Sequence, residues 1–134
     1  MQTILKISEA AAIALHAADY MAQRRELCSA HEIAKALGVS YNHLSKVLQT
    51  LTKAGLISPV RGPKGGFTLS PAGRKADVRG IMTAIDGPVR LHSCLMGAKV
   101  CRHRDCMFGR FLEDTNRRFD AVLDGKISEF SKRK

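Results

Sequence analysis

The fold is decided by the stretch Ser29–Ser70, which reads S-A-H-E-I-A-K-A-L-G-V-S-Y-N-H-L-S-K-V-L-Q-T-L-T-K-A-G-L-I-S-P-V-R-G-P-K-G-G-F-T-L-S. It opens with the pattern of a reciprocal capping box, in which Ser29 can accept from the N–H of Glu32 and Glu32 can reach back to that of Ser29. Gly38 can adopt the left-handed conformation that ends a short helix. The stretch therefore begins with a short helix.

A second helix follows directly. Ser40 is a good N-cap, and Gly55 is placed to end the helix. Its apolar residues recur at helical spacing and predict a buried stripe of Leu44, Val47, Leu48 and Leu51. Two short helices joined by a tight glycine turn are typical of a helix-turn-helix, whose second helix is the recognition helix.

A β-hairpin is expected next. Residues 56–60 and 67–69 are strand-like, and 61–66 are rich in glycine and basic residues. This hairpin has the features of a wing. Between Ile33 and Ala76 there is no Asp or Glu, and the basic residues there are Lys35, Lys46, Lys53, Arg61, Lys64, Arg74 and Lys75. Because phosphate contacts release counterions and a carboxylate would repel phosphate, such a surface favours nucleic acid over an ordinary solvated face.

Composition narrows the partner. The 134 residues carry a net charge of +10, which favours an acidic partner. With no Trp and two Tyr, the chain has few aromatic side chains on which the bases of a single strand could stack. Duplex DNA is therefore the predicted ligand. The apolar run at residues 10–18 is too short to span a membrane, and a cytoplasmic location is expected.

The start of a recognition helix reaches base edges. We therefore predict base readout by Tyr41, Asn42 and His43, and phosphate contacts by Ser40 and Lys46.

At the wing tip, Arg61 and Lys64 are expected to meet the DNA backbone or minor groove. Gly65 and Gly66 are expected to permit close approach to the duplex.

Three of the four cysteines, Cys94, Cys101 and Cys106, are spaced Cys-x6-Cys-x4-Cys in a predicted loop. Three thiolates suit an iron–sulfur cluster or zinc. Thiol redox chemistry and plain structural cysteines are the alternatives. The candidates for a fourth ligand are Glu9, Cys28, His92 and His103. For Cys28 a role as a small buried residue is favoured over ligation.

The rest of the chain is predicted to be helical, over residues 4–23, Val78–Asp86 and 107–126, with Pro71–Gly73 as a loop and Cys106 at the start of the last helix. That last helix has an apolar face expected to pair with a second copy. Its members are Phe108, Phe111, Leu112, Thr115, Phe119, Val122 and Leu123. Burial of this face within the monomer is the alternative.

The predicted fold class is mainly α with a small β-hairpin wing, a winged helix-turn-helix followed by a long C-terminal dimerisation helix. Its expected units are a DNA-binding domain (1–87), a cysteine loop (88–106), and a dimerisation helix with a basic tail (107–134). A C2 dimer would present two recognition helices to a palindromic operator.

The chain resembles the Rrf family of bacterial winged-helix regulators over essentially its whole length. The resemblance is carried by S-E-x-A at Ser8, by K-A-G-L-I-S-P-V-R-G-P-K-G-G-F-T-L at 53–69, and by the three-cysteine loop before a long helix. The recognition helix, S-x-N-H-L-x-K-V from Ser40, is most similar to the nitric-oxide-sensing branch of that family.

The resemblance implies a dimeric repressor whose DNA affinity depends on a 2Fe–2S or 4Fe–4S cluster held by Cys94, Cys101 and Cys106. In the nitric-oxide branch an acidic residue from the other subunit's first helix completes the site, and Glu9 of the partner subunit matches that position. The biogenesis branch uses a histidine shortly after the third cysteine, where this chain has Gly109. Nitric oxide, oxidative stress or iron status would be the signal.

Two other classes of function remain. A cluster-free regulator would use the cysteines as thiol sensors or as a zinc site, and an interaction module would use the wing for protein contacts. An enzyme is not expected, because the sequence has no phosphate loop and no nucleophile–base motif.

Overall fold

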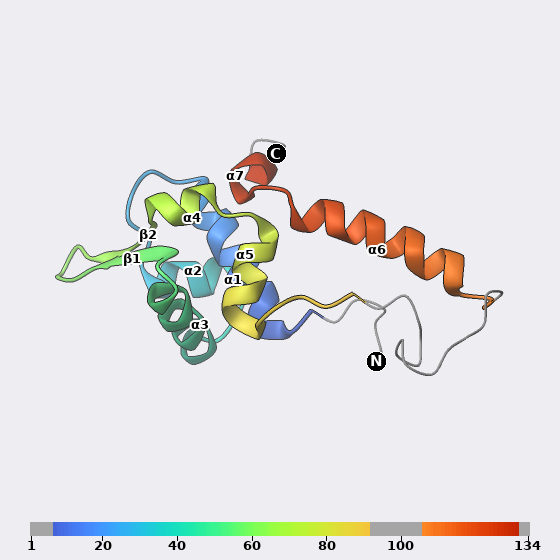
Figure 1. Cartoon of the computed structure of the whole chain (residues 1–134). Coiled ribbons are helices and arrows are strands. Elements are labelled where there is room, and N and C mark those ends of the chain that lie inside the picture. Colours follow the sequence, from blue (N-terminus) through green and yellow to red (C-terminus); the bar gives the residue numbers. More distant parts are fainter. Residues whose placement is uncertain (1–6, 92–105, 132–134) are drawn as a thin grey trace.

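The computed structural model describes residues 7–91 and 106–131, which form a helical head and a helical arm (Figure 1). In chain order the head contains α1 (Glu9–Ala22), α2 (Ala30–Leu37), α3 (Tyr41–Lys53), β1 (Ile57–Val60), β2 (Gly66–Leu69), α4 (Pro71–Lys75) and α5 (Val78–Asp86). The arm is α6 (Gly109–Leu123), and α7 (Ile127–Ser131) returns to the head. The predicted fold class, mainly helical with a two-stranded hairpin, is confirmed.

Helix α1 is the centre of the head. Its many alanines allow close packing, and the core beside it draws on α3, α5 and α7. The fully or nearly fully buried residues of α1 are Ala11, Ile13, Ala14, Ala17, Ala18 and Met21. The helix begins at Glu9, because the Ser8 side chain caps it by accepting from the N–H of Ala11 at 3.0 Å. The helix was predicted from residue 4, and this is wrong for Ile7 and Ser8, which precede α1. Ile4 lies outside the described residues.

The helix-turn-helix forms where the sequence predicted it. Ser29 accepts from the N–H of Glu32 at 3.0 Å, and Gly38 ends α2 with φ of 70°. Only this half of the capping box is confirmed, since Oε2 of Glu32 instead accepts from the Tyr20 hydroxyl at 2.7 Å. Ser40 caps α3 by accepting from the N–H of His43 at 3.1 Å, and the predicted leucine–valine stripe is buried.

The wing is an antiparallel hairpin whose register runs from Ile57 opposite Leu69 to Val60 opposite Gly66. A third segment joins it, because the N–H of Cys28 donates to the Phe67 carbonyl at 2.9 Å and the N–H of Phe67 donates to the Cys28 carbonyl at 2.8 Å. The chain before α2 thus fixes the wing to the head.

Two predictions about the later helices are wrong. The loop predicted at Pro71–Gly73 is the start of α4, because the Ser70 side chain caps it by accepting from the N–H of Gly73 and proline is favourable in the first turn.

The long helix predicted at 107–126 ends at Leu123. There the chain turns to pair with the segment before α5: Asp77 and Lys126 form a bridge, and the N–H of Val78 donates to the Gly125 carbonyl at 2.9 Å. The helix also begins later than predicted, at Gly109, so Cys106 precedes it.

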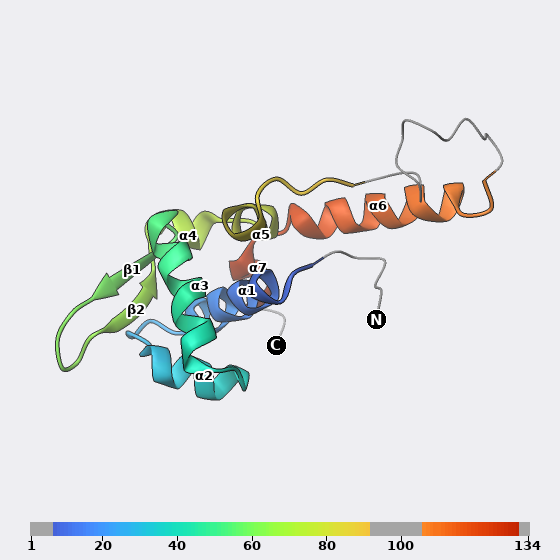
Figure 2. The ribbon, with the colours of Figure 1, turned by 90° about the horizontal axis from the view of Figure 1, so that it is seen from below.

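The arm leaves the head beside the start of α5. Figures 1 and 2 both show α6 extending beyond the head, with the wing at the opposite end of the molecule. Arg79 of α5 ties the root of α6 by ion pairs to Asp120 and, at 3.3 Å, to Asp124. The arm is therefore anchored at its C-terminal end, and its N-terminal end lies furthest from the wing.

Candidate nucleic-acid interface and cysteine site

The start of α3 presents the predicted readout residues at the surface. Tyr41 is 44% exposed, Asn42 and Lys46 are exposed, and His43 is half-buried. The oxygen of Ser40 accepts the capping hydrogen bond, which leaves its hydroxyl hydrogen available to donate to a phosphate. Their roles in DNA contact stay predictions.

Tyr41 also has a partner that sequence reasoning missed. Its ring stacks on that of His31 in the first turn of α2, with centroids 4.1 Å apart and planes inclined by 10°. The two residues lie on different helices, so no periodicity could pair them. Only the geometry of the turn at Gly38 brings them together.

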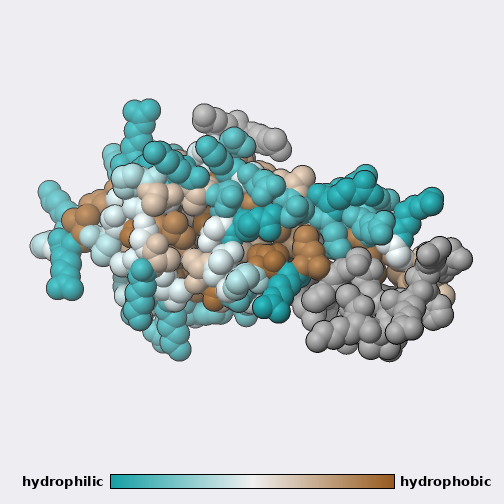
Figure 3. All heavy atoms as spheres, viewed as in Figure 1, coloured by the Kyte–Doolittle hydropathy of each residue, from teal (hydrophilic) through white to brown (hydrophobic). Residues whose placement is uncertain are grey.

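Arg61 and Lys64 are exposed at the tip of the wing. Hydrophilic side chains project from this end of the molecule (Figure 3). The two glycines beside them are needed by the wing itself. A Cβ at Gly65 would collide with the Val60 carbonyl, and one at Gly66 would lie 2.7 Å from the Cys28 carbonyl. Their predicted role in close approach to DNA therefore stays a prediction, and the backbone contacts give an independent reason for glycine.

The surface that joins α3, the wing and α4 carries no acidic side chain, because all three elements fall within the carboxylate-free stretch. Glu32, the acid that precedes this stretch, is held by Tyr20. Arg24 lies over the Tyr20 ring, 3.4 Å from its centroid, and places a positive charge beside the hydrogen-bonded Tyr20 and Glu32. The hydrogen bond to Glu32 raises the pKa of Tyr20. The surface is electrostatically suited to a polyanion.

Among the described residues, Cys28 joins no group of side chains that could hold a metal ion. Its side chain is 1% exposed, beneath the wing, and burial raises the pKa of its thiol. The wing and the start of α6 lie at opposite ends of the molecule in Figures 1 and 2, so one chain cannot bring Cys28 to Cys106. Cys28 and Cys106 of one chain are therefore far apart, and the role of Cys28 as a ligand stays a prediction. The preferred interpretation of Cys28 as a small buried residue is confirmed.

The cysteine site is only partly described. Cys106 is half-buried just before α6, whereas Cys94, Cys101, His92 and His103 lie outside the described residues. Within residues 7–91 and 106–131, no three His, Cys, Asp or Glu side chains converge as a metal site would require.

Glu9 is exposed at the start of α1. The start of α1 lies well away from the start of α6 in both views. Glu9 and Cys106 of one chain are therefore not brought together in this arrangement.

The start of α1 is tied instead to the end of α5. Besides capping α1, the Ser8 hydroxyl donates to Oδ2 of Asp86 at 2.6 Å. Asp86 is the last residue of α5, and the segment that leads to the cysteines leaves the head directly after it. This hydrogen bond links the helix of Glu9 to the start of that segment.

The predicted dimerisation face is divided by the fold. Leu112 is buried, Phe119 packs against the head and Thr115 is half-buried. The members of the face that remain exposed are Phe108, Phe111 and Val122, beside Met107. About half of the apolar stripe is thus used within the chain, and the other half faces outward.

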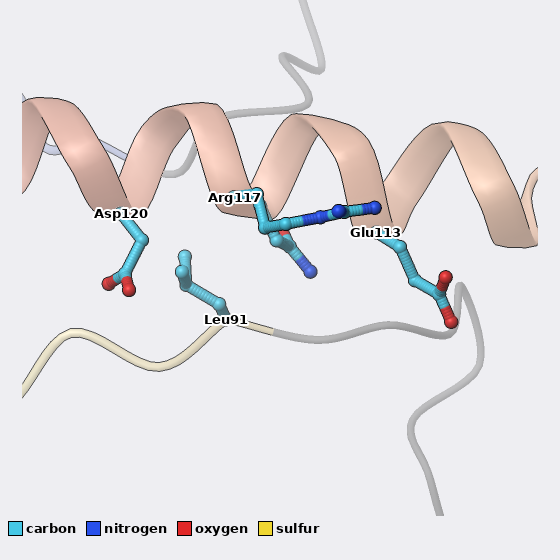
Figure 4. A pocket seen from close by; sticks show the side chains of 5 residues that line it. Leu91, Glu113, Arg117 and Asp120 are labelled. Atoms are coloured by element: carbon cyan, nitrogen blue, oxygen red, sulfur yellow. The ribbon is translucent and has the colours of Figure 1, made fainter.

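A hollow of about 360 Å³ lies between α6 and the segment that follows α5 (Figure 4). Its lining residues are Leu91, Glu113, Asn116, Arg117 and Asp120. Leu91 faces the helix between side chains of both charges, so the hollow carries no single sign of charge. In the described part of the chain, no helix is long and apolar enough to cross a membrane.

A helix-turn-helix followed by a basic two-stranded wing defines the winged helix-turn-helix class of DNA-binding domain. The family comparison agrees with this class. The chain belongs to the Rrf2 family, described as an iron-dependent transcriptional regulator, whose profile matches residues 7–127. It is accordingly a DNA-binding transcriptional regulator and not an enzyme, as the sequence predicted.

Two relatives illustrate the similarity. The chain is 32% identical over 100 residues to the HTH-type transcriptional repressor NsrR of Streptomyces coelicolor, covering 74% of this chain and 67% of the relative. It is 30% identical over 94 residues to the HTH-type transcriptional regulator IscR of Serratia proteamaculans, covering 69% of this chain. The match spans only 57% of that second relative's length.

Solved structures share the fold. CymR, the global cysteine regulator of B. subtilis, aligns with a TM-score of 0.71 at 21% identity, covering 98% of this chain and 99% of CymR. The IscR structure from T. potens aligns with a TM-score of 0.69 at 23% identity, covering 97% of this chain and 88% of that one.

Proposed function

We propose that this chain is a dimeric, sequence-specific regulator, acting as a repressor at a palindromic operator. Its operator affinity would be set by an iron–sulfur cluster held by Cys94, Cys101, Cys106 and Glu9 of the partner subunit. The observation that carries the DNA part is the carboxylate-free surface shared by α3 and the wing. The cluster part is supported by the donor set and by the similarity to NsrR and IscR.

The donor set fits such a cluster in chemistry. Three thiolates and one carboxylate offer the anionic ligands that iron accepts, and Cys106 and Glu9 both have solvent access. Because the starts of α1 and α6 lie apart in one chain, a second copy is the natural source of Glu9. When bound, a cluster supplies iron that nitric oxide or oxygen can modify and that iron scarcity can remove.

The chain's own residues connect this site to the DNA-binding head. Ser8 holds the start of α1 against Asp86, where the cysteine segment begins, and Arg79 holds the root of α6 against α5. A change in the cysteine segment therefore acts on the spacing of two heads through α1, α5 and α6. A tenfold change in operator affinity needs only about 1.4 kcal/mol of differential binding.

The DNA part is tested by measuring duplex affinity against salt concentration. Each lost phosphate contact lowers the slope of log affinity against log salt by about one, so R61A and K64A should each have this effect. R110A, which removes an exposed charge on the arm, is the matched control and should leave the slope unchanged. A wild-type protein that binds no duplex in dilute buffer would contradict the proposal.

The cluster part is tested by anaerobic purification, followed by a visible spectrum, iron and sulfide analysis, and operator binding before and after cluster loss. A coloured protein whose affinity changes on cluster loss is expected. C94A, C101A and C106A should each be colourless, and E9Q should have a labile cluster. Equal affinity of the two forms would contradict the switch.

A cluster-free regulator is the second candidate. It is favoured by the structural similarity to CymR, for which an oxidised form from Staphylococcus aureus has been solved at 22% identity to this chain. In that case the anaerobic protein is colourless, and DNA binding responds to an oxidant or, for a zinc site, to a chelator.

A further inference from the structure

The stack of His31 on Tyr41 joins a predicted readout residue to a side chain that has no part in the predicted readout. The two rings are nearly parallel, 4.1 Å between centroids, and both side chains are exposed. An exposed pair shields little apolar area. What it does achieve is to join the first turn of α2 to the first residue of α3, and Figures 1 and 2 show these helices side by side.

The stack covers one face of the Tyr41 ring and so restricts the side chain's rotation. Its hydroxyl lies at the far end of the ring, away from the backbone, and remains able to donate or accept. A side chain already held in its bound orientation loses less conformational entropy on binding than a free one. It also presents its hydroxyl to one position on the duplex, which is what discrimination between sequences requires.

We propose that His31 is a positioning residue for DNA recognition. By stacking on Tyr41 it fixes the direction of that side chain at the start of the recognition helix, and thereby raises selectivity for the operator over other DNA. The inference rests on the proposed function, because it takes α3 to be the element that reads the duplex. It assigns the effect to the flat ring of His31 and not to a phosphate contact by its nitrogens.

The stack itself can be tested without DNA. The chain has no Trp and two Tyr, so in a Y20F background all tyrosine emission comes from Tyr41. H31A in that background should lower the fluorescence anisotropy of Tyr41, because the ring rotates more freely. H31F, which keeps a flat ring, should leave it unchanged. Equal anisotropy in all three proteins would overturn the proposal.

Selectivity is tested with a duplex selected by the wild-type protein from a random library and with a shuffled duplex of the same composition. H31A should lower the ratio of the two affinities by about two- to tenfold, the range expected for one aromatic pair, with the affinity for shuffled DNA unchanged. H31F should restore the ratio. The double variant H31A/Y41A should be no less selective than Y41A, since the two residues act as one unit.

K35A is the matched control, because Lys35 is exposed one turn further along α2 and its loss removes a charge. It should leave the ratio unchanged, whatever its effect on overall affinity. If the wild type is selective but H31A leaves the ratio of the two affinities unchanged, this inference alone is overturned. Additive effects of H31A and Y41A on that ratio would also overturn it. A wild type that enriches no sequence would overturn the proposed function as well.

Discussion

Gly66 and Cys28 meet where β2 crosses the segment before α2, and their contact decides how the wing is held. The backbones exchange two hydrogen bonds through Cys28 and Phe67, and this leaves no room for a Cβ at position 66. The sequence indicated a glycine-rich wing but not this contact, because nothing in either segment alone marks the other as its partner.

We expect G66A to destabilise the protein by about 1–3 kcal/mol, because the added methyl group must displace the Cys28 backbone. Chemical unfolding under reducing conditions measures the effect. G109A is the matched control, since a Cβ there meets its nearest neighbour at an ordinary 3.6 Å and alanine is the better helix former. Equal stability of G66A and wild type would show that the wing is not held in this way.

Cys28 is expected to make the free energy of unfolding depend on pH in the alkaline range. Burial, reinforced by the charge of Glu32, raises the pKa of its thiol above the usual value. The unfolded chain therefore loses this proton at a lower pH than the folded one. The stabilisation is complete below the usual cysteine pKa and is lost as pH rises through the raised one.

In a background with Cys94, Cys101 and Cys106 replaced by alanine, the protein should lose stability as pH rises from about 8 to 10, beyond the usual cysteine pKa. C28A in the same background should lose less. The stability difference between the two proteins, from urea unfolding at each pH, isolates Cys28 because other titrating groups cancel. A difference that stays constant with pH would contradict the buried neutral thiol.

Among the elements, the junction of α5 and α6 shows where local patterns stop being informative. Capping residues and glycines predicted α2, α3 and the wing, since their signals lie within a few residues of each boundary. They did not predict the end of α6 at Leu123, which depends on a bridge between Asp77 and Lys126. In the candidate interface the same limit applies: Tyr41 could be picked as a surface residue, but its stack on His31 could not.

Asp77 contributes to this junction twice, by capping α5 through the N–H of Gly80 at 2.7 Å and by taking part in the bridge. We expect D77A to lower the free energy of unfolding by about 1 kcal/mol, the usual cost of a lost N-cap. D77N should retain most of the stability, because asparagine caps equally well. Thermal melts of the three proteins provide the measurement, and equal losses in D77A and D77N would point away from the cap.

In the molecule as a whole, the basic head and the partly apolar arm differ in the character of their surfaces. Phe108, Phe111 and Val122 are each nearly half exposed on α6, beside an 88%-exposed Met107. The exposed apolar face suits pairing with a second copy, which the proposed palindromic operator also requires.

We expect F111D to shift the protein from dimer to monomer, because a carboxylate on this face would have to be desolvated against apolar side chains. Sedimentation velocity would measure the change, with circular dichroism to show that the head stays folded. R118A, an exposed position on the same helix outside the apolar face, should remain dimeric. A monomeric wild type would contradict the assignment of this face.

Because α6 is anchored at one end only, the helix can act as a lever on the head. Its 15 residues form a stiff rod of ~22 Å, fixed to the head at Arg79 and at the Asp77–Lys126 pairing. With a helix of this length, a sideways displacement of ~2 Å at the Cys106 end corresponds to a rotation of only ~5° about the anchored C-terminal end. A force applied at the Cys106 end of α6 therefore acts with the leverage of the whole helix on its anchored end. There, either the head rotates together with α6 or the backbone segments paired through Asp77 and Lys126 separate.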